Sequence, residues 1–160
     1  MPKDISGAKH SPPLTFKWGT FCRQVVVDAN NPLDFSLIGV LTKPKMSFES
    51  TSDHIEFPTS IWVHAEFDVN IKVEAETTFK LSMRLARSDR EPHVTGFDVK
   101  ISPGQDILAV NIQLLLGPDD KSAGLRLVDG GNFIQASFKY KSSSLGMVEL
   151  PIAVTLNKKV

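Results

Sequence analysis

Two consecutive stretches of alternating apolar and polar residues, within residues 60–86, constrain the fold of this chain more than any other feature. The first has an apolar side chain at every second position from Ile61 to Val69, and the second does so from Phe79 to Leu85. Successive side chains of a β-strand point to opposite faces, so each stretch has one apolar and one mainly polar face. We therefore predict two half-buried strands, each with one face in a hydrophobic core.

Further alternating or apolar stretches occur along most of the chain, separated by turn sequences rich in Gly, Pro, Asn and Asp. No stretch has a convincing apolar stripe with the 3.6-residue period of a helix. The sequence therefore predicts an all-β fold, an antiparallel β-sandwich of about eight or nine strands, with a closed barrel as second choice. The side chains expected in the core include Leu81, Met83, Val110, Ile112 and Phe138.

Several local patterns make more specific predictions. Residues 35–41 are apolar on both faces, which is typical of a central strand. Residues 46–49 are expected to form a short edge strand, and Pro151, which has no N–H, is expected at an edge or a bulge. Residues 125–127 form at most a brief strand, and the Asp-Gly-Gly-Asn sequence at 129–132 indicates a hairpin turn.

Length and cysteine content indicate one domain in a reducing compartment. Residues 1–13 have no periodicity and are interpreted as a flexible leader before a single domain at 14–160. Cys22 is the only cysteine, so no intramolecular disulfide can form, and the first residues lack the apolar region of a signal peptide. We expect a soluble cytoplasmic protein that resembles, in general type, many small stand-alone bacterial proteins; no specific family is indicated.

The charge balance argues against nucleic acid and membrane partners. The chain has 18 Lys and Arg against 18 Asp and Glu, so its formal net charge is zero. The C-terminal part is mildly basic around Lys139 and Lys141, but Tyr140 between them is expected to point inward, where it could not stack on bases. No apolar run approaches the ~20 residues of a membrane-spanning helix.

The sequence contains no recognised catalytic, metal-binding or phosphate-binding motif. His64 lies two residues before Glu66 on the polar face of its strand. A solvated face is the expected setting for this pair, ahead of a metal or general-base role. Cys22 has no partner in the sequence and is expected to be a small buried apolar residue. We therefore predict no enzyme activity, no catalytic residues, no metal ligands and no cofactor.

Acidic residues in turns leave one alternative open, a sandwich whose end loops bind calcium or a small molecule. Calcium takes roughly six to eight oxygen ligands from converging groups. Asp is also common in turns for reasons of local hydrogen bonding. The residues concerned are Asp28, Asp34, Asp119, Asp120 and Asp129.

Trp62 suggests a contact surface. It shares the polar row with His64 and Glu66, and a solvated face would rarely carry an indole. Its cover could be the leader, a loop or a second chain, and we hypothesise a second chain because Trp is enriched among interface anchors. These three residues are the predicted binding site of a non-catalytic module that acts through protein–protein interaction or self-association, with an unidentified protein or a second copy as partner.

Overall fold

The computed structural model describes residues 11–31, 34–42, 45–50, 52–57, 60–115 and 125–158. These residues form eleven β-strands and no helix, so no helix within them could cross a membrane. The strands are β1 (Leu14–Val27), β2 (Phe35–Leu41), β3 (Lys45–Ser50), β4 (His54–Phe57), β5 (Ser60–Val69), β6 (Thr77–Arg87), β7 (Arg90–Ile101), β8 (Ile107–Leu115), β9 (Leu125–Val128), β10 (Gly130–Tyr140) and β11 (Ser143–Lys158).

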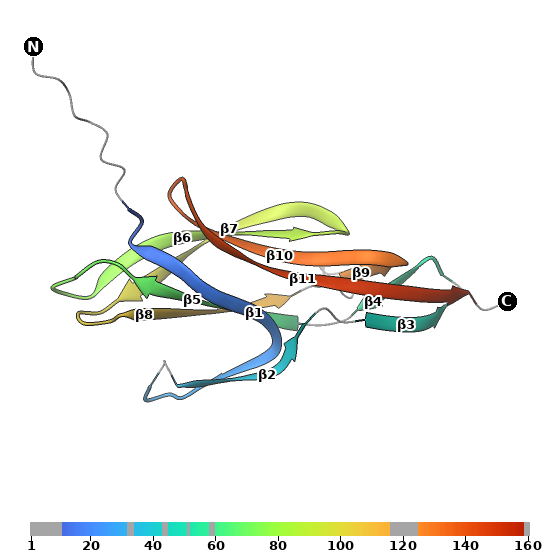
Figure 1. The fold of residues 1–160 in the computed structure, drawn as a ribbon, viewed down its shortest axis with the longest axis horizontal. Helices are drawn as coiled ribbons and strands as arrows, with labels where there is room; N and C mark the ends of the chain where they lie inside the picture. Colours follow the sequence, from blue (N-terminus) through green and yellow to red (C-terminus); the bar gives the residue numbers. More distant parts are fainter. Residues whose placement is uncertain are drawn as a thin grey trace, which may run out of the picture.

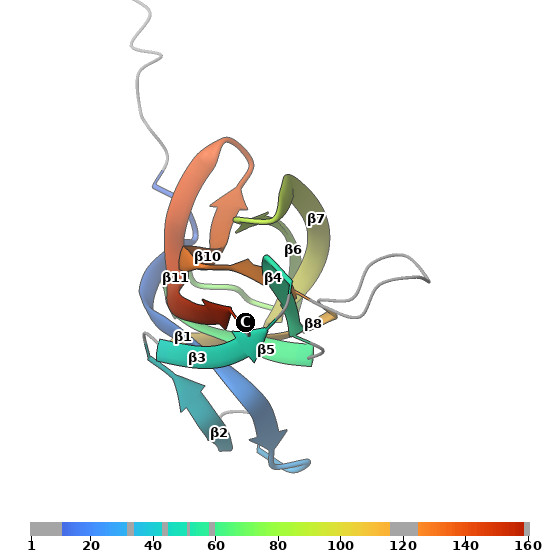
Figure 2. The same cartoon turned by 90° about the vertical axis from the view of Figure 1, so that its right-hand side faces the viewer.

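Nine of the strands form two sheets that pack face to face (Figures 1 and 2). One sheet has the order β2-β1-β5-β8 and the other the order β3-β11-β10-β6-β7, while β4 and β9 form a separate pair. The strand pairs of the described residues are antiparallel except β3–β11, which is parallel. The predicted β-sandwich is therefore confirmed, and the sheets do not close into a barrel.

The two alternating stretches became β5 and β6, which belong to opposite sheets. Their apolar rows face each other across the core, where the side chains of Val63 and Leu81 are buried. The core prediction is confirmed for the following four residues: Leu81, Met83, Val110 and Phe138. Ile112 is only half-buried, because it lies in β8 at the edge of its sheet.

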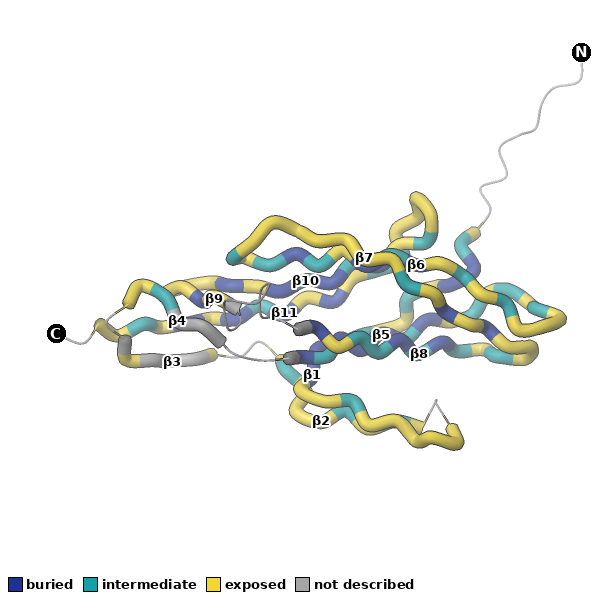
Figure 3. Tube along the Cα trace, turned by 180° about the vertical axis from the view of Figure 1, so that it is seen from behind, coloured by how far each residue is buried: buried dark blue, intermediate teal, exposed yellow. Residues whose placement is uncertain are grey.

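The predicted central strand at residues 35–41 is wrong. These residues form β2, the edge strand of the four-stranded sheet. Phe35 and Leu37 are half-buried, but Ile38 and Val40 on the opposite face are exposed (Figure 3). An apolar strand is central only if a second layer covers each face, and no described element covers the outer side of β2.

The other local predictions have mixed outcomes. Residues 46–49 lie in β3, an edge strand as predicted. Pro151 pairs with β10 on one side, and β3 joins the other side only from Ala153 onward, so its edge position is confirmed. Residues 125–127 lie in β9 as expected, but the predicted hairpin is wrong, because β9 pairs with β4 instead of β10. The turn itself is present, with Gly130 at φ 101°.

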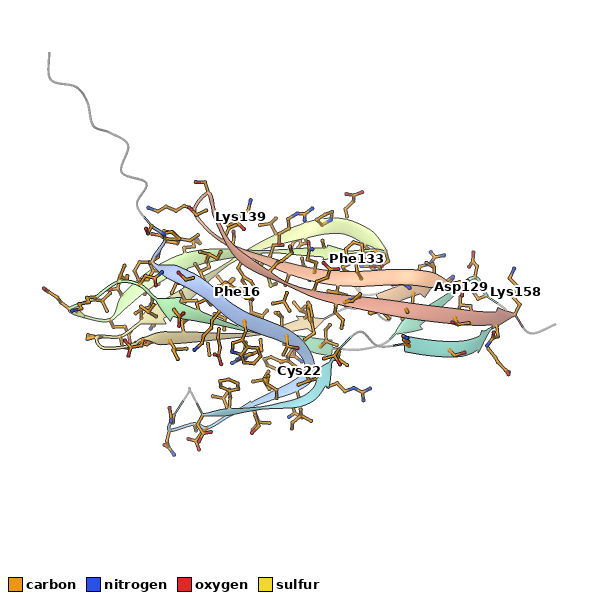
Figure 4. All side chains as sticks on the ribbon, viewed as in Figure 1. Phe16, Cys22, Asp129, Phe133, Lys139 and Lys158 are labelled. Atoms are coloured by element: carbon orange, nitrogen blue, oxygen red, sulfur yellow. The ribbon has the colours of Figure 1, made fainter. Side chains whose placement is uncertain are left out.

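The first strand has two different partners along its length. β1 pairs with β5 up to Cys22 and with β2 from Phe21 onward. Beyond Cys22, labelled in Figure 4 at the bend, β1 leaves β5 and returns through a turn as a hairpin with β2. Asp28 closes this turn by accepting hydrogen bonds from the amides of Asn30 and Asn31, at 2.7 and 3.1 Å. We call residues 21–41 the β1–β2 hairpin.

Most of the predicted leader lies outside the described residues. Its last part, residues 11–13, is described and runs beside the end of β5. The carbonyl of Pro13 accepts a hydrogen bond of 2.8 Å from the Asn70 amide, and that of Pro12 accepts one of 3.4 Å from the Asn70 side chain.

Substitutions at two neighbouring positions of β6 should differ strongly in their effect on stability. Leu81→Ala removes a core side chain that is 1% exposed, so it should lower the free energy of unfolding by about 2–5 kcal/mol. Lys80→Ala, on the exposed face, should cost less than about 0.5 kcal/mol. Urea denaturation of the two variants measures both values. Equal costs would mean that the two faces of β6 are wrongly assigned.

Candidate functional site

His64 is fully buried, so the predicted solvated face is wrong at this position. Its side chain is 0% exposed and belongs to the outer face of β5, away from the core between the sheets. The imidazole lies between the indole of Trp18, with ring centres 4.9 Å apart, and the ring of Phe35 at 4.5 Å. Phe35 belongs to β2, so the burial arises because the β1–β2 hairpin folds back across the outer face of β5.

The polar atoms of this group contact one another. The Nδ1 atom of His64 lies 2.6 Å from Oδ1 of Asn111, and Nε2 lies 3.4 Å from Oε1 of Glu66. The other carboxylate oxygen of Glu66 accepts a 2.7 Å hydrogen bond from the indole N–H of Trp18. We call these five residues, Trp18, Phe35, His64, Glu66 and Asn111, the His64 cluster.

The His64 cluster joins four strands and therefore holds the β1–β2 hairpin in place. Its members come from β1, β2, β5 and β8, which are all the strands of the four-stranded sheet. An imidazole with no exposed surface cannot reach a substrate, so the geometry does not suit general-base catalysis by His64. Buried polar groups with partners restrict a structure to one arrangement. The role that fits these contacts is positioning of the hairpin.

Only two of the three predicted site residues come together. His64 and Glu66 are in contact, whereas Trp62 lies farther along β5, opposite Cys22 of β1 and Gln113 of β8. Trp62 is half-buried within the chain. The described end of the leader lies beside Asn70, at the other end of β5, and does not cover it. A second chain on Trp62 stays a prediction.

Three members of the cluster were missed from the sequence: Trp18, Phe35 and Asn111. Each belongs to a strand other than β5, and the pairing that brings them to His64 is long-range. The available signal was Asn111, one of two polar residues within the apolar stretch at 107–116. A polar residue in such a place indicates a specific hydrogen-bond partner.

The β1–β2 hairpin exposes a group of branched apolar side chains that we call the hairpin surface. Each is between 42% and 49% exposed. Figure 3 shows the hairpin beside the two layers of the sandwich, with most of β2 exposed. The members are Val26, Ile38 and Val40 on one face of the hairpin and Val27 on the other.

The edge formed by β2 also lacks two of the usual protections against pairing with another chain, charged residues and proline. No residue between Phe35 and Leu41 is charged or a proline. By contrast, the exposed start of β7 contains Arg90, Glu91 and Pro92. Charged residues and proline on an edge strand prevent its free N–H and C=O groups from pairing with a second strand.

The two remaining edges differ from β2 as well. The exposed residues of β3 include Lys45 and Glu49, which are charged. Among the described side chains of β8, Gln113 alone is exposed, so this edge presents little apolar surface. Among the edge strands of the described residues, β2 is therefore the one that carries no charge and exposes apolar side chains.

A second polar group lies at the turn between β6 and β7. Arg87 donates two hydrogen bonds of 2.8 Å to the carboxylate of Asp89, and the backbone amide of Arg126 in β9 donates a third at 3.0 Å. Burial raises the pKa of Asp89, but these hydrogen bonds outweigh burial and hold the pKa below its ordinary value. This group attaches the β4–β9 pair to the five-stranded sheet.

Cys22 is buried, as the sequence predicted. Burial raises the pKa of its thiol, and a hydrogen bond from the backbone of Gln24 lowers it. The effect of burial is the larger, so the pKa lies above its ordinary value. A thiol with a raised pKa forms less of the reactive thiolate at neutral pH. The environment of Cys22 therefore favours a packing role over a nucleophilic one.

Two of the acidic residues considered for calcium, Asp28 and Asp129, have structural roles, while Asp34 contributes backbone hydrogen bonds to the turn that Asp28 closes. Asp28 closes the turn of the β1–β2 hairpin, and Asp129 accepts a 2.8 Å hydrogen bond from the amide of Leu156. Asp119 and Asp120 lie outside the described residues. In the described part of the chain, no group of three or more His, Cys, Asp or Glu side chains is arranged so that it could hold a metal ion.

Removing the His64 side chain should destabilise the protein. His64→Ala leaves Asn111 without the imidazole and removes one of the two contacts of Glu66, which should lower the free energy of unfolding by about 1–3 kcal/mol. The measurement is denaturation followed by tryptophan fluorescence, because Trp18 lies on the imidazole. His93→Ala, at an exposed position of β7, is the control and should cost less than about 0.5 kcal/mol. Equal costs would contradict the positioning role.

Comparison with known proteins gives no independent assignment. No protein-family model matches the chain, and no curated protein is significantly similar to it.

Proposed function

We propose that this chain is a non-catalytic, cytoplasmic binding module that acts through protein–protein contact, and that the hairpin surface is the contact site. The observation that carries the proposal is β2, an uncharged apolar edge strand with exposed Ile38 and Val40. Such an edge is a template for another strand, because its N–H and C=O groups on one side have no neighbour in the sheet. Strand addition at an exposed edge is a common way to bind a protein segment.

The His64 cluster supports the same proposal. Binding by a mobile segment carries an additional entropic cost, and a segment fixed in advance avoids it. Phe35 of β2 packs on His64, which is itself held by Asn111, so the hairpin is anchored to the sandwich through Phe35. The hairpin surface is therefore presented by a fixed support.

The cytoplasmic location belongs to the proposal. Cys22, the only cysteine, is buried, and the fold uses no disulfide. This composition suits a reducing compartment.

Differential capture of bound proteins tests the contact site. The full-length chain is expressed in cells with an affinity tag, together with an untagged second copy of the same chain. The tagged protein is purified in two forms, the original sequence and the double variant Ile38→Lys/Val40→Lys. The control is Val94→Lys/Met147→Lys, which places the same charges at exposed apolar positions of the other sheet. Circular dichroism and thermal unfolding establish that all three proteins are folded.

The original chain and the control should retain the same bound proteins, and the hairpin variant should lose at least one of them. Quantitative mass spectrometry measures the difference, and the untagged copy is counted as a possible partner. If the three samples retain the same proteins in the same amounts, the hairpin surface is not the contact site.

A further inference from the structure

We propose that a groove between β1 and β11, at the side of the sandwich, binds a small organic cation that carries a methylated ammonium group. The two strands belong to different sheets and lie side by side (Figures 1 and 2). The groove has a volume of about 410 Å³, and small-molecule sites have volumes of roughly 300–1,000 Å³. Its size therefore suits a small molecule.

Close contact between β1 and β11 forms the bottom of the groove. A Cβ atom on Gly19 of β1 would lie only 2.5 Å from Cγ2 of Val148 in β11, and 2.7 Å from the carbonyl oxygen of His64. A side chain at this position would push the two strands apart. Both Gly19 and the buried Val148 line the groove, which therefore lies on the outside of a packed contact between the sheets.

Trp18 offers a ligand in this groove an aromatic ring that is already fixed. Its indole N–H is donated to Glu66 at 2.7 Å, and the ring lies on the imidazole of His64 with centres 4.9 Å apart. The side chain is still 39% exposed, and it lines the groove. Tryptophan is the preferred aromatic partner of a cation, because its ring face carries partial negative charge. A ring held in advance binds without an additional entropic cost.

The charges at the groove are negative. Glu149 of β11 lines it with an exposed side chain, and a hydrogen bond of 3.2 Å from Gln135 to Oε2 orients the carboxylate. The carboxylate of Glu66 adds a second negative charge at the edge of the Trp18 indole. No Lys or Arg occurs among the described residues that line the groove. The site therefore attracts a cation and repels an anion.

The apolar side chains of the groove favour an organic cation over a metal ion. Met147 is 56% exposed, and its flexible, polarizable side chain can adapt to the methyl groups of a ligand. Leu41 and Pro151 add further apolar surface. A hard metal ion such as calcium needs roughly six to eight oxygen ligands, and the described lining offers one carboxylate. An ammonium group with methyl substituents matches both the charge and the apolar surface.

Titration of the full chain with choline, followed by NMR, tests the site. The indole N–H signal of Trp18, identified as the one that remains in Trp62→Phe, should shift with a dissociation constant of about 1 mM. The amide signals of Met147 and Glu149 should shift with it. The uncharged analogue of choline, in which a carbon atom replaces the nitrogen, should bind at least about tenfold more weakly, because the ring and the carboxylate attract the charge.

Two substitutions in the groove should weaken choline binding, and two matched controls should not. Glu149→Gln keeps the size of the side chain and should raise the dissociation constant about threefold, because it removes an exposed carboxylate. Met147→Lys should raise it more than about tenfold, because it places a cation in the groove. The controls are Glu91→Gln and Val94→Lys, both at exposed positions of β7. Circular dichroism establishes that each variant is folded.

Three results would overturn the cation site: no shift of the Trp18 signal at about 20 mM choline, equal binding of the uncharged analogue, or groove variants that bind choline as their controls do. The site is separate from the hairpin surface, because Ile38 and Val40 do not line the groove. A failure of choline binding therefore leaves the proposed contact site standing, and the capture experiment tests that site independently.

Discussion

Asp89→Ala should lower the free energy of unfolding by about 3–5 kcal/mol, because it breaks the buried ion pair between Asp89 and the guanidinium of Arg87. The side chains of Arg87 and Asp89 are only 8% and 4% exposed, and the substitution also removes the acceptor of the Arg126 amide. Chemical denaturation measures the effect. Asp98→Ala, at an exposed position of β7, is the control and should cost less than about 0.5 kcal/mol.

The same residue should contribute to a loss of stability in acid. The pKa of Asp89 is lower in the folded chain than its ordinary value of about 3.9, so the unfolded chain takes up the proton more readily. Its contribution is therefore present above that value and lost as the pH falls through the folded pKa. The stability difference between the original chain and Asp89→Asn should shrink as the pH falls below about 4. A difference that stays constant through this range would contradict the assignment.

Phe138→Ala should also cost about 3–5 kcal/mol, because it opens a large cavity between the two sheets. Phe138 is 0% exposed, and its ring makes edge contacts with Phe67 of β5 and Phe97 of β7, at centre-to-centre distances of 5.6 and 6.5 Å. The contact with Phe67 joins the five-stranded sheet to the four-stranded sheet, whereas Phe97 belongs to the same sheet as Phe138.

Phe133→Ala on the same strand is the matched control for Phe138→Ala. Phe133 is 39% exposed on the opposite face of β10, so its removal should cost clearly less. Thermal and urea unfolding of both variants give the comparison. Similar costs for the two variants would show that the core does not lie where the structure places it.

Alternation along single strands was sufficient to predict the sandwich and most of its core. The rows that include Leu81, Val110 and Phe138 alternate with polar residues, and burial of one face is a property of each strand alone. Pro151 was also placed correctly, since a residue without an N–H restricts its own pairing.

The wrong predictions, for β2 and for His64, concern which neighbouring segments bury a strand. The composition of β2 is that of a central strand, but its position depends on how β1 bends beyond Cys22 and on which strands remain as neighbours. His64 lies in the mainly polar row of β5, next to Glu66, so local sequence predicted a solvated face. Phe35 and Trp18 bury it from strands that are distant in sequence, and no local pattern reveals such contacts.

The same reasoning explains the limited success at the candidate site. Sequence placed His64 and Glu66 on one face correctly, because both belong to β5. Trp62 was grouped with them because it lies in the same alternating row of β5. Alternation alone does not show which residues of a row are buried by the same neighbouring segment. The hairpin surface was missed because residues 35–41 were assigned to the interior.

Photo-crosslinking in cells tests most directly whether β2 is in contact with another protein chain. A benzophenone amino acid replaces Ile38 in one protein and Val94 in another; both positions are exposed on edge strands of opposite sheets. Irradiation should give a discrete covalent adduct with a protein from position 38 and none from position 94, and mass spectrometry identifies the partner. Absence of an adduct at position 38, or the same adducts from both positions, would contradict a contact site on the β1–β2 hairpin.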